Sequence, residues 1–450
     1  MRRICAIAVL IALGSAASGQ LSPAREEALR AVARGEAVAW PAAGAKEARL
    51  LHEKAEGYLA NLQEHHLPNG LAVGILWEDD TRAKVLAYGG VDDGAGRQGR
   101  YLAVLAFKYA VRHDEETLEE ILKVLAAFDL LITISGREGY LVRYAGPASD
   151  EHYRDIYKTY PRGEDPREKG LGKAAHKGAG PRDHMVWLGA TSPGIYDGAA
   201  LGLAAALKYV DAPEAQRRTR QILRRMGKRL AEDGWNIEDN RGRRTHTSIA
   251  WRLVWMRLLM SADPALYEHL ARDYRALFDK LMERKDTLRP VDKYAEDYAN
   301  NIIDFDRYFV LFALETDPDR KRTYGELLRE NYERAGDHLN PHLAAVYLLA
   351  KGNPDKANAR ATLEGMLLDF PAPPYRLRAV DRRENELIEM AGPGTSEFAL
   401  LARERIPSEA LWSQPPCRAV GGEEKNLEFT GLDYLLPYWM ARLAGVLDFM

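Results

Sequence analysis

The chain has 450 residues, with 63 basic and 66 acidic side chains and a formal net charge of −3 at pH 7. It has no basic tract with interleaved aromatic residues, which argues against nucleic acid as a partner. Only two cysteines are present, so a disulfide-rich scaffold is excluded and the fold must rest on its hydrophobic core.

Residues 1–20 are predicted to be a secretory signal peptide. Two arginines follow the initiator methionine, residues 4–13 are apolar, and the small residues 17–19 offer a cleavage site. An apolar run of about ten residues is too short for a membrane-spanning helix. Removal of the signal leaves Cys417 alone. We expect a secreted or periplasmic product that is not inserted in a membrane.

Residues 21–450 are predicted to form one domain, which begins with amphipathic helices between residues 22 and 64. Apolar residues recur there at helical spacing, with charged residues on the opposite face. The run LAVGILW (71–77) is the one convincing strand, and it predicts a short β-hairpin near residues 70–88.

From residue 88 onward, the chain alternates between two kinds of helix. The stretch RYLAVLAFKYAV (100–111) is apolar on nearly every face, whereas EETLEEILKVLAAFDLLIT (115–133) has one apolar stripe and an acidic face. A helix that is apolar all round belongs inside, and a helix with one apolar stripe belongs at the surface. The order of polar loop, inner helix and outer helix recurs up to LLPYWMARLAGVL (435–447).

Inner and outer helices that alternate about six times describe an all-α fold, the (α/α)6 toroid. The helix near residues 45–65 would be the outer partner of the last inner helix. An open solenoid of helical hairpins is the alternative. Solenoid repeats usually keep a fixed period, whereas the loops here lengthen to the segments 134–183 and 369–428. Long loops in a compact domain tend to be functional, and we favour the closed toroid.

Four stretches carry a family resemblance: YGGVDDGAGRQGRYLAVLAFKYAV (88–111), ISGREGYLVRY (134–144), GIYDGAALGLAAAL (194–207) and GLDYLLPYWMARLAGVL (431–447). They resemble secreted bacterial proteins of the six-hairpin glycosidase-like superfamily, over most of the chain from about residue 85. The resemblance implies an (α/α)6 toroid with a cleft where the N-termini of the inner helices converge. The superfamily contains glycoside hydrolases, uronyl hydrolases and lyases, so it narrows the substrate class without fixing a reaction.

The chain departs from this family in the first of the four stretches. Gly94-Ala95-Gly96-Arg97 stands where the resemblance leads us to expect a small residue and an aromatic residue after the acidic one. This departure argues against an aromatic platform for sugar at that place.

Glycoside hydrolysis needs two carboxyl groups that flank one bond, one to donate a proton and one to act as base or nucleophile. Acidic residues at the predicted entrances of the inner helices are Asp92, Asp93, Asp197, Glu238, Asp239, Asp304, Glu428 and Asp433. We predict Asp93, Asp197, Glu428 and Asp433 as the catalytic set, with Asp197 first because it opens the most Gly/Ala-rich inner helix. For each of them, the alternative is an acid that only caps its helix.

Two arginines and two aromatic residues are the first candidates for substrate binding. Arg137 and Arg143 could clamp a uronic-acid carboxylate bidentately, or they could pair with neighbouring acids in a solvated loop. Trp187 and Tyr196, which we expect in loops, offer aromatic faces on which sugar rings could stack. The alternative for both is a place in the core.

His246 and His342 both lie at predicted entrances of inner helices and complete the binding candidates. A facing histidine pair would suit proton abstraction and return, as sugar epimerases of this architecture use. A capping or packing role is the alternative for each. One cysteine and scattered histidines predict no metal site, and no nucleotide-binding fingerprint is present, so no cofactor is expected.

These patterns predict a secreted carbohydrate-active enzyme, a glycoside hydrolase with paired carboxylates that acts as a monomer on an oligo- or polysaccharide. Two alternatives stay open. One is a non-catalytic toroid that binds glycan or protein, and the other is a polysaccharide lyase or sugar epimerase that uses histidine and tyrosine.

Overall fold

The computed structural model describes residues 21–42, 44–152, 174–239, 242–284, 292–296, 298–350, 356–409 and 411–447. The predicted signal peptide lies outside these residues. Within them the chain is mostly helical, as predicted. The helices of four residues or more are α1 (Pro23–Ala33), α2 (Ala45–His65), α3 (Gly94–Arg112), α4 (Glu115–Leu131), α6 (Pro193–Tyr209), α7 (Pro213–Glu232), α8 (Ile249–Ala262), α9 (Pro264–Tyr267), α10 (Ala271–Glu283), α11 (Tyr298–Leu314), α12 (Pro318–Ala335), α13 (Pro341–Leu349), α14 (Lys356–Asp369) and α15 (Leu432–Leu443).

The helices alternate between two patterns of burial, as their sequences predict. In α3, every residue from Gly94 to Tyr109 is buried. In α4, the buried residues form one stripe that includes Ile121 and Phe128. The same contrast separates the nearly fully buried α6 from α7, where charged residues fill the remaining face. The periodicity of apolar residues therefore predicts the burial of these four helices correctly. It fails for α14, which the alternation makes an outer helix but which is buried at every residue from Ala361 to Asp369.

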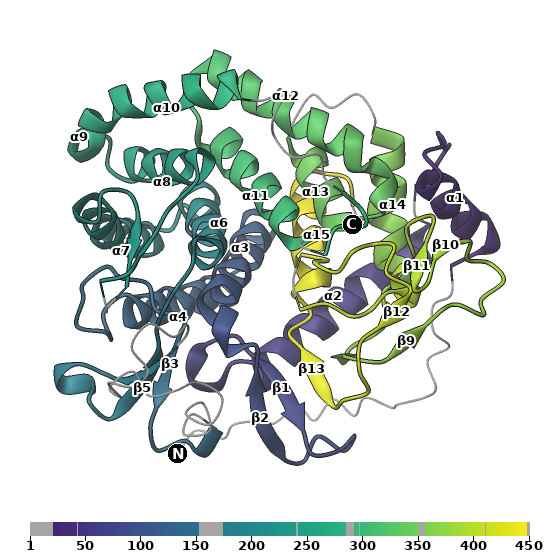
Figure 1. The fold of residues 1–450 in the computed structure, drawn as a ribbon, viewed down its shortest axis with the longest axis horizontal. Helices are drawn as coiled ribbons and strands as arrows, with labels where there is room; N and C mark the ends of the chain where they lie inside the picture. Colours follow the sequence, from purple (N-terminus) through teal and green to yellow (C-terminus); the bar gives the residue numbers. More distant parts are fainter. Residues whose placement is uncertain are drawn as a thin grey trace.

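Contacts between the enclosed helices follow a closed order. α3 packs on α6, α6 on α8, α8 on α11, α11 on α13, α13 on α15, and α15 on α3, and α11 also packs directly on α6. The helices with one buried stripe lie against this set, and Figure 1 shows α10 and α12 at its periphery. α2 packs on α14 and α15, so the helix predicted near residues 45–65 is the neighbour of the last helix.

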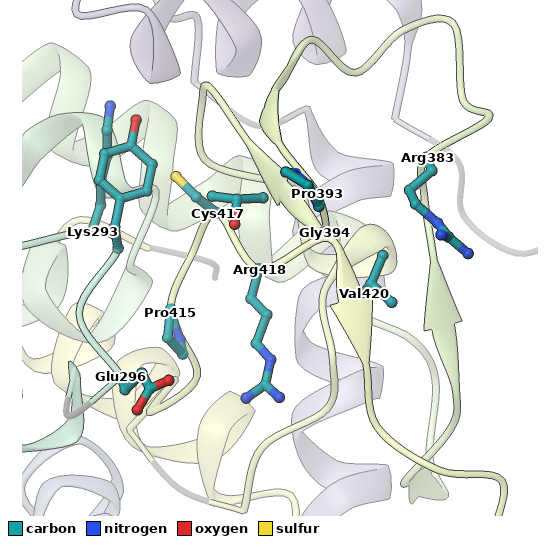
Figure 2. A pocket seen from close by; sticks show the side chains of 11 residues that line it. Lys293, Glu296, Arg383, Pro393, Gly394, Pro415, Cys417, Arg418 and Val420 are labelled. Atoms are coloured by element: carbon teal, nitrogen blue, oxygen red, sulfur yellow. The ribbon is translucent and has the colours of Figure 1, made fainter.

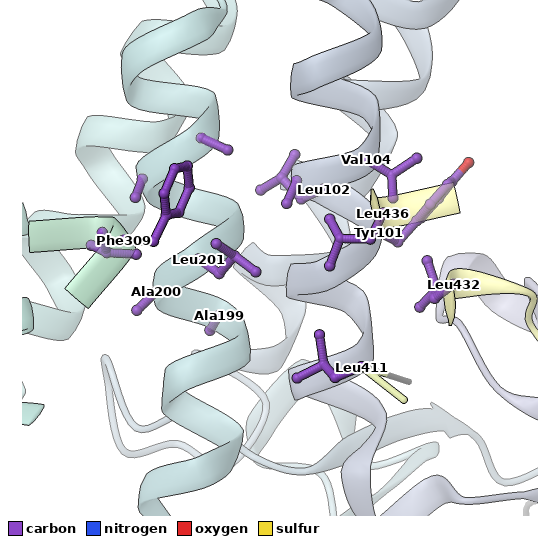
Figure 3. Close-up of a cluster of buried hydrophobic side chains, with 14 of the residues drawn as sticks. Tyr101, Leu102, Val104, Ala199, Ala200, Leu201, Phe309, Leu411, Leu432 and Leu436 are labelled. Atoms are coloured by element: carbon purple, nitrogen blue, oxygen red, sulfur yellow. The ribbon is translucent and has the colours of Figure 1, made fainter. Parts of the chain in front are cut away.

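The closest helix pair, α3 and α6, is held together by glycine. A Cβ atom on Gly99 would overlap the backbone oxygen of Gly198, and one on Gly202 would overlap the backbone of Gly99. Only glycine permits this approach of two helix backbones. Figure 3 shows the core beside this contact, with Leu102 of α3 between Leu201 of α6 and the side chains of α15.

Short antiparallel strands connect the helices and join the two ends of the chain. The hairpin predicted near residues 70–88 is confirmed as β1 and β2, and β13 pairs with β1 on its other edge, with Ile75 opposite Glu428. Figure 1 shows these strands side by side. The long segments expected as loops contain short strands as well. The strands are β1 (Gly74–Trp77), β2 (Val85–Gly89), β3 (Tyr144–Pro147), β4 (Ala175–Lys177), β5 (Met185–Leu188), β6 (Ile237–Glu238), β7 (Arg244–Thr245), β8 (Tyr375–Arg376), β9 (Val380–Asp381), β10 (Met390–Gly392), β11 (Thr395–Ser396), β12 (Val420–Gly421) and β13 (Leu427–Phe429).

Candidate functional site

A cavity of about 320 Å³ lies at the N-terminal ends of three enclosed helices, α3, α6 and α11. Its volume falls within the range of small-molecule sites. The segment that precedes α15 closes the remaining side. The lining combines acidic, basic and apolar side chains: Asp92, Asp93, Arg100, Arg143, Ser192, Gly194, Ile195, Ala299, Ile303, Glu409, Leu411 and Ser413.

Asp93 is the predicted catalytic residue that the structure places in this cavity. It occupies the N-cap position of α3, yet its side chain makes no capping hydrogen bond. Its Oδ2 instead accepts a hydrogen bond of 2.9 Å from Arg100 Nη1, and its side chain is 42% exposed. The capping alternative therefore does not explain Asp93. Outer helices show what capping looks like, because Asp114 accepts the backbone N–H of Thr117 at 2.7 Å.

Glu409 is the second carboxyl group of the cavity, and the sequence analysis did not select it. It comes from the long segment between α14 and α15, which has no helical periodicity to mark an entrance. Its Oε2 lies 2.5 Å from Nη2 of Arg97, a nearly fully buried residue of α3. One signal could have revealed it. A buried arginine such as Arg97, inside an otherwise apolar helix, requires an acidic partner from elsewhere in the chain.

The turn at Gly90 makes room for this second carboxyl group. Gly90 has φ +63°, and a Cβ atom there would overlap both the Glu409 carboxylate and the Arg97 guanidinium. The Arg97 side chain also donates to the backbone oxygens of Gly90 and Ala72, at 3.1 Å each. These bonds hold Arg97 in place. The turn before α3 and the Glu409 segment are thus packed against one another.

Burial raises the pKa of the Glu409 carboxyl group. Arg97 opposes this rise, while the nearby charges of Asp93 and Asp92 add to it. Glu409 Oε1 is buried and has no hydrogen-bond partner among the described residues. A carboxyl group with a raised pKa is suited to hold a proton near neutral pH.

Asp433, predicted as catalytic, instead anchors the segment that carries Glu409. It is buried in the first turn of α15 and does not line the cavity. Its carboxylate accepts hydrogen bonds from the Ser408 hydroxyl and, at 2.8 Å, from the backbone N–H of Trp412. Burial raises its pKa to about 6, and these hydrogen bonds oppose the rise. The role of Asp433 is therefore to position its neighbours.

The anchored segment also contains strained backbone. Leu411 and Trp412 have φ of 62° and 55°, a left-handed conformation that costs free energy for residues with a side chain. Leu411 lines the cavity. Strain of this kind persists only where surrounding contacts enforce it, and Asp433 supplies those contacts at Trp412.

Asp197, the first choice from the sequence, is buried within α6 and not exposed at its entrance. Arg307 of α11 binds it bidentately, with Nε–Oδ1 and Nη2–Oδ2 distances of 2.9 and 2.7 Å. Burial raises the pKa of Asp197 to about 6, against the effect of Arg307. Asp304 pairs with the same arginine at 2.7 Å. The expectation for Asp197 is corrected to an ion pair that joins two helices, because α6 begins earlier than the sequence suggested.

Glu428 lies in β13 and is fully buried, outside the cavity. It accepts hydrogen bonds from Asn61 at 2.8 Å, Arg82 at 2.9 Å and Trp77 at 3.1 Å, and His66 Nε2 lies 3.0 Å from it. Burial alone would raise its pKa, but the hydrogen bonds from His66 and Asn61 and the Arg82 charge lower it. The expectation of a catalytic Glu428 is corrected to a fully bonded link between the two ends of the chain.

The two predicted arginines are separated by the fold. Arg143 lines the cavity, but its Nε donates to the backbone oxygen of Ala190 at 2.9 Å and its Nη1 to that of Asp92. Arg137 lies outside, where its Nη2 is 3.0 Å from both Asp233 and Glu238. A bidentate clamp made by both arginines is therefore not formed.

The predicted aromatic candidates are in the core. Trp187 lies in β5, stacked on His176 with ring centroids 4.4 Å apart, and Tyr196 lies within α6. Both are buried in regular elements, so the expectation that they lie in loops is wrong. Strand pairing on both edges of β5 encloses Trp187. Among the described residues, no aromatic ring lines the cavity.

The two predicted histidines do not face one another across a site. His342 is fully buried at the start of α13, with its Nε2 2.6 Å from Asp306. His246 is exposed beyond β7. Neither lines the cavity, so the epimerase alternative has no histidine pair.

Two further properties of the described residues concern metal binding and membrane-spanning helices. They contain no group of three histidine, cysteine or acidic side chains arranged to hold a metal ion. None of their helices combines the length and the apolar character that crossing a membrane requires.

Comparison with known proteins assigns no function to this site. No protein-family model, no curated protein and no solved structure matches the chain.

Proposed function

We propose that this protein is an (α/α)6 toroid of the six-hairpin glycosidase-like superfamily, exported from the cell, and that it hydrolyses a glycosidic bond in the cavity described above. Support for the toroid comes from the cyclic order of contacts among the enclosed helices and from the packing of α2 on α15. Support for the superfamily remains the resemblance of its four sequence stretches.

The observation that carries the proposed reaction is one cavity in which two of the three lining carboxyl groups, those of Glu409 and Asp93, have unlike surroundings. Glu409 has a raised pKa and an oxygen without a partner, whereas Asp93 is more exposed and held by Arg100. Pairs of carboxyl groups that differ in this way divide the work of glycosidases between an acid and a base or nucleophile.

In the proposed reaction, Glu409 donates its proton to the oxygen of the leaving sugar while the bond between that oxygen and the anomeric carbon breaks. Asp93 either attacks the anomeric carbon or removes a proton from the water that does so. Water supplies the hydroxyl group of the new reducing end in both cases. Arg100 keeps Asp93 oriented, and the apolar side chains of Ile195, Ile303 and Leu411 offer contact to the C–H faces of a sugar.

The test is turnover on a panel of oligo- and polysaccharides, measured as release of reducing ends. Wild-type protein is compared with Glu409→Gln and Asp93→Asn, and with the matched controls Glu333→Gln and Asp279→Asn on the exposed faces of α12 and α10. We expect cleavage of at least one glycan by the wild type and by both controls, and its loss in both cavity variants. Identical product profiles in all five proteins would refute the proposal.

A second candidate, binding of a glycan without cleavage, is favoured by one observation. Glu409 and Asp93 each already have an arginine partner, and ion pairs of this kind also occur in sites with no chemistry. The same panel separates the two functions. Saturable binding with no product, unchanged in Glu409→Gln, would establish the second.

A further inference from the structure

A second and larger cavity, of about 840 Å³, lies among the loops that follow α14 and the segment that precedes α11. It is outside the site described above and shares none of its lining residues. Figure 2 shows its walls, which are built from residues 293–296 on one side and from the strands around β10, β11 and β12 on the other. Its lining is Lys293, Tyr294, Glu296, Arg383, Pro393, Gly394, Thr395, Pro415, Cys417, Arg418 and Val420.

The two cavities are lined by neighbouring residues of the same two chain segments. Ser413 lines the first cavity and Pro415 the second, while Ala299 lines the first and Glu296 the second. Two residues of chain span at most about 7 Å, and three at most about 11 Å. These parts of the two walls are therefore close enough for an extended glycan to contact both.

The second cavity carries one cation that no acid neutralises among the described residues. Lys293 pairs with Asp337 at 2.9 Å, and Arg383 is paired with Asp381. Arg418 is exposed, and its Nη1 donates to Gln414 Oε1 at a marginal distance of 3.5 Å. Figure 2 shows its side chain extended away from the backbone, between Glu296 on one side and Val420 on the other.

The remaining lining residues add a neutral thiol, an aromatic face and one carboxylate, Glu296, whose charge opposes part of the positive charge of Arg418. Burial raises the pKa of the Cys417 thiol to about 11, so the sulfur is uncharged at neutral pH. Tyr294 is 46% exposed, and its hydroxyl donates to the backbone oxygen of Glu397 at 2.9 Å, which fixes the ring. Glu296 is the single carboxylate of the lining.

We propose that the second cavity binds an acidic sugar unit of a glycan, with Arg418 engaging its carboxylate or sulfate ester and Tyr294 contacting its ring. A guanidinium presents its donors in a planar fork that fits either group bidentately. This inference deepens the proposed function, since it assigns the substrate to the anionic glycans.

The test is calorimetric titration of the full-length Glu409→Gln protein, which retains the second cavity unaltered, with three probes. They are oligogalacturonate, a heparin-derived oligosaccharide and a neutral cello-oligosaccharide of the same length. We expect one of the acidic probes to bind, and the one that binds identifies carboxylate or sulfate as the group recognised. Adding Arg418→Ala should weaken its binding about ten- to a hundredfold, with a smaller loss for Arg418→Lys.

Two controls keep this inference testable by itself. Arg322→Ala removes an exposed arginine of α12 and should leave binding unchanged, and added NaCl should weaken it. Equal binding of the neutral probe, or equal affinity with and without Arg418, would overturn the inference. If anionic binding depends on Arg418 but the wild type cleaves no glycan, the proposed hydrolysis is refuted and the anion site is supported. If neutral glycans are cleaved and Arg418→Ala has no effect, the anion site is refuted and the proposed hydrolysis is supported.

Discussion

Two regions of this molecule contain a glutamate beside an arginine, and they differ in how completely the carboxylate is bonded. Glu428 has four side-chain partners and a lowered pKa, and it joins α2, the first hairpin and β13. Glu409 has one arginine partner, one oxygen without any among the described residues, and a raised pKa. A glutamate thus holds distant segments together in one place, and in the other it lines the cavity with a raised pKa.

The histidine in the first region sharpens this difference. His66 Nδ1 lies 2.8 Å from the backbone oxygen of Val73 and its Nε2 lies 3.0 Å from Glu428. Both of its ring nitrogens are thus within hydrogen-bond distance of an oxygen. Glu428 is surrounded by donors and by the Arg82 charge, which lower its pKa. Glu409 faces Asp93 and Asp92 instead, which favour its protonated form.

The largest effect that separates the two glutamates is expected in catalysis. Glu409→Gln should lower kcat/KM on a cleaved glycan about 10²- to 10⁴-fold, because it removes the proton donor. Glu428→Gln should leave kcat/KM unchanged per folded molecule, since Glu428 does not line the cavity. Initial rates of reducing-end release, corrected for the folded fraction, check this. Equal losses in both variants would erase the distinction.

For the free energy of unfolding, we expect the larger loss in Glu428→Gln and the smaller in Glu409→Gln. Glu428→Gln replaces a charge that is bonded to His66 and Arg82, and we expect it to lower the free energy of unfolding by about 1.5–3 kcal/mol. Glu409→Gln should cost less, because the glutamine oxygen can still accept from Arg97, which also keeps its two backbone acceptors, and because burial already disfavours the charge of Glu409. Urea denaturation of both variants measures the difference. The control Glu423→Gln affects an exposed pair with Lys425 and should stay within about 0.5 kcal/mol of the wild type. A larger cost for Glu409→Gln than for Glu428→Gln would contradict the comparison.

The Glu409 region rests on α3, whose close contact with α6 glycine substitutions can break. Gly99→Ala places a methyl group against the Gly198 backbone, and we expect a loss of about 1–3 kcal/mol. Gly336→Ala is the matched control, because a Cβ atom there meets nothing within 4 Å. Thermal and urea unfolding of the two variants test this. A stable Gly99→Ala protein would mean that the two backbones are further apart than described.

The smallest effects are expected in the pH dependence of stability, and their signs differ. The lowered pKa of Glu428 contributes stability above about pH 4.3 that is lost as the pH falls through its folded-state pKa. The raised pKa of Asp433 contributes stability below about pH 3.9 that is lost as the pH rises through about 6. Each slope is at most about 1.4 kcal/mol per pH unit.

Urea unfolding between about pH 3 and 7 separates these contributions. Glu428→Gln should weaken the loss of stability on the acid side, whereas Asp433→Asn should flatten the decline between about pH 4 and 6. If both variants changed the stability over the same pH range and in the same direction, the opposite pKa shifts of the two carboxyl groups would be refuted.

The helical part of the fold could be predicted because burial leaves a local, periodic pattern in the sequence. The all-round apolar stretch 100–111 lies in the enclosed α3, and the striped stretch 115–133 contains α4, which is buried on one face. Strand boundaries in the long segments were not predictable, since strands of two or three residues have no pattern of their own. Trp187 was mistaken for a loop residue for this reason.

The candidate site could be predicted only in part. Asp93 was selected correctly for the cavity because its helix begins directly after it. Glu409 was missed because nothing near it in the sequence indicates a helix entrance, and its neighbour in space, Arg97, is far away in the chain. Asp197 and Asp433 were placed near helix starts, but acids at such positions can turn inward as well as outward.

The sequence by itself determined the burial of α3, α4, α6 and α7, where the first hairpin lies and which acid opens α3, because each depends on residues a few positions apart. Only the tertiary structure decided which carboxyl groups are fully bonded and which keep a free oxygen. The partners that settle this come from distant segments, as with Glu428 and His66, which are 362 residues apart. A carboxylate's pKa follows from burial and from such neighbours, and neither is written in its local sequence.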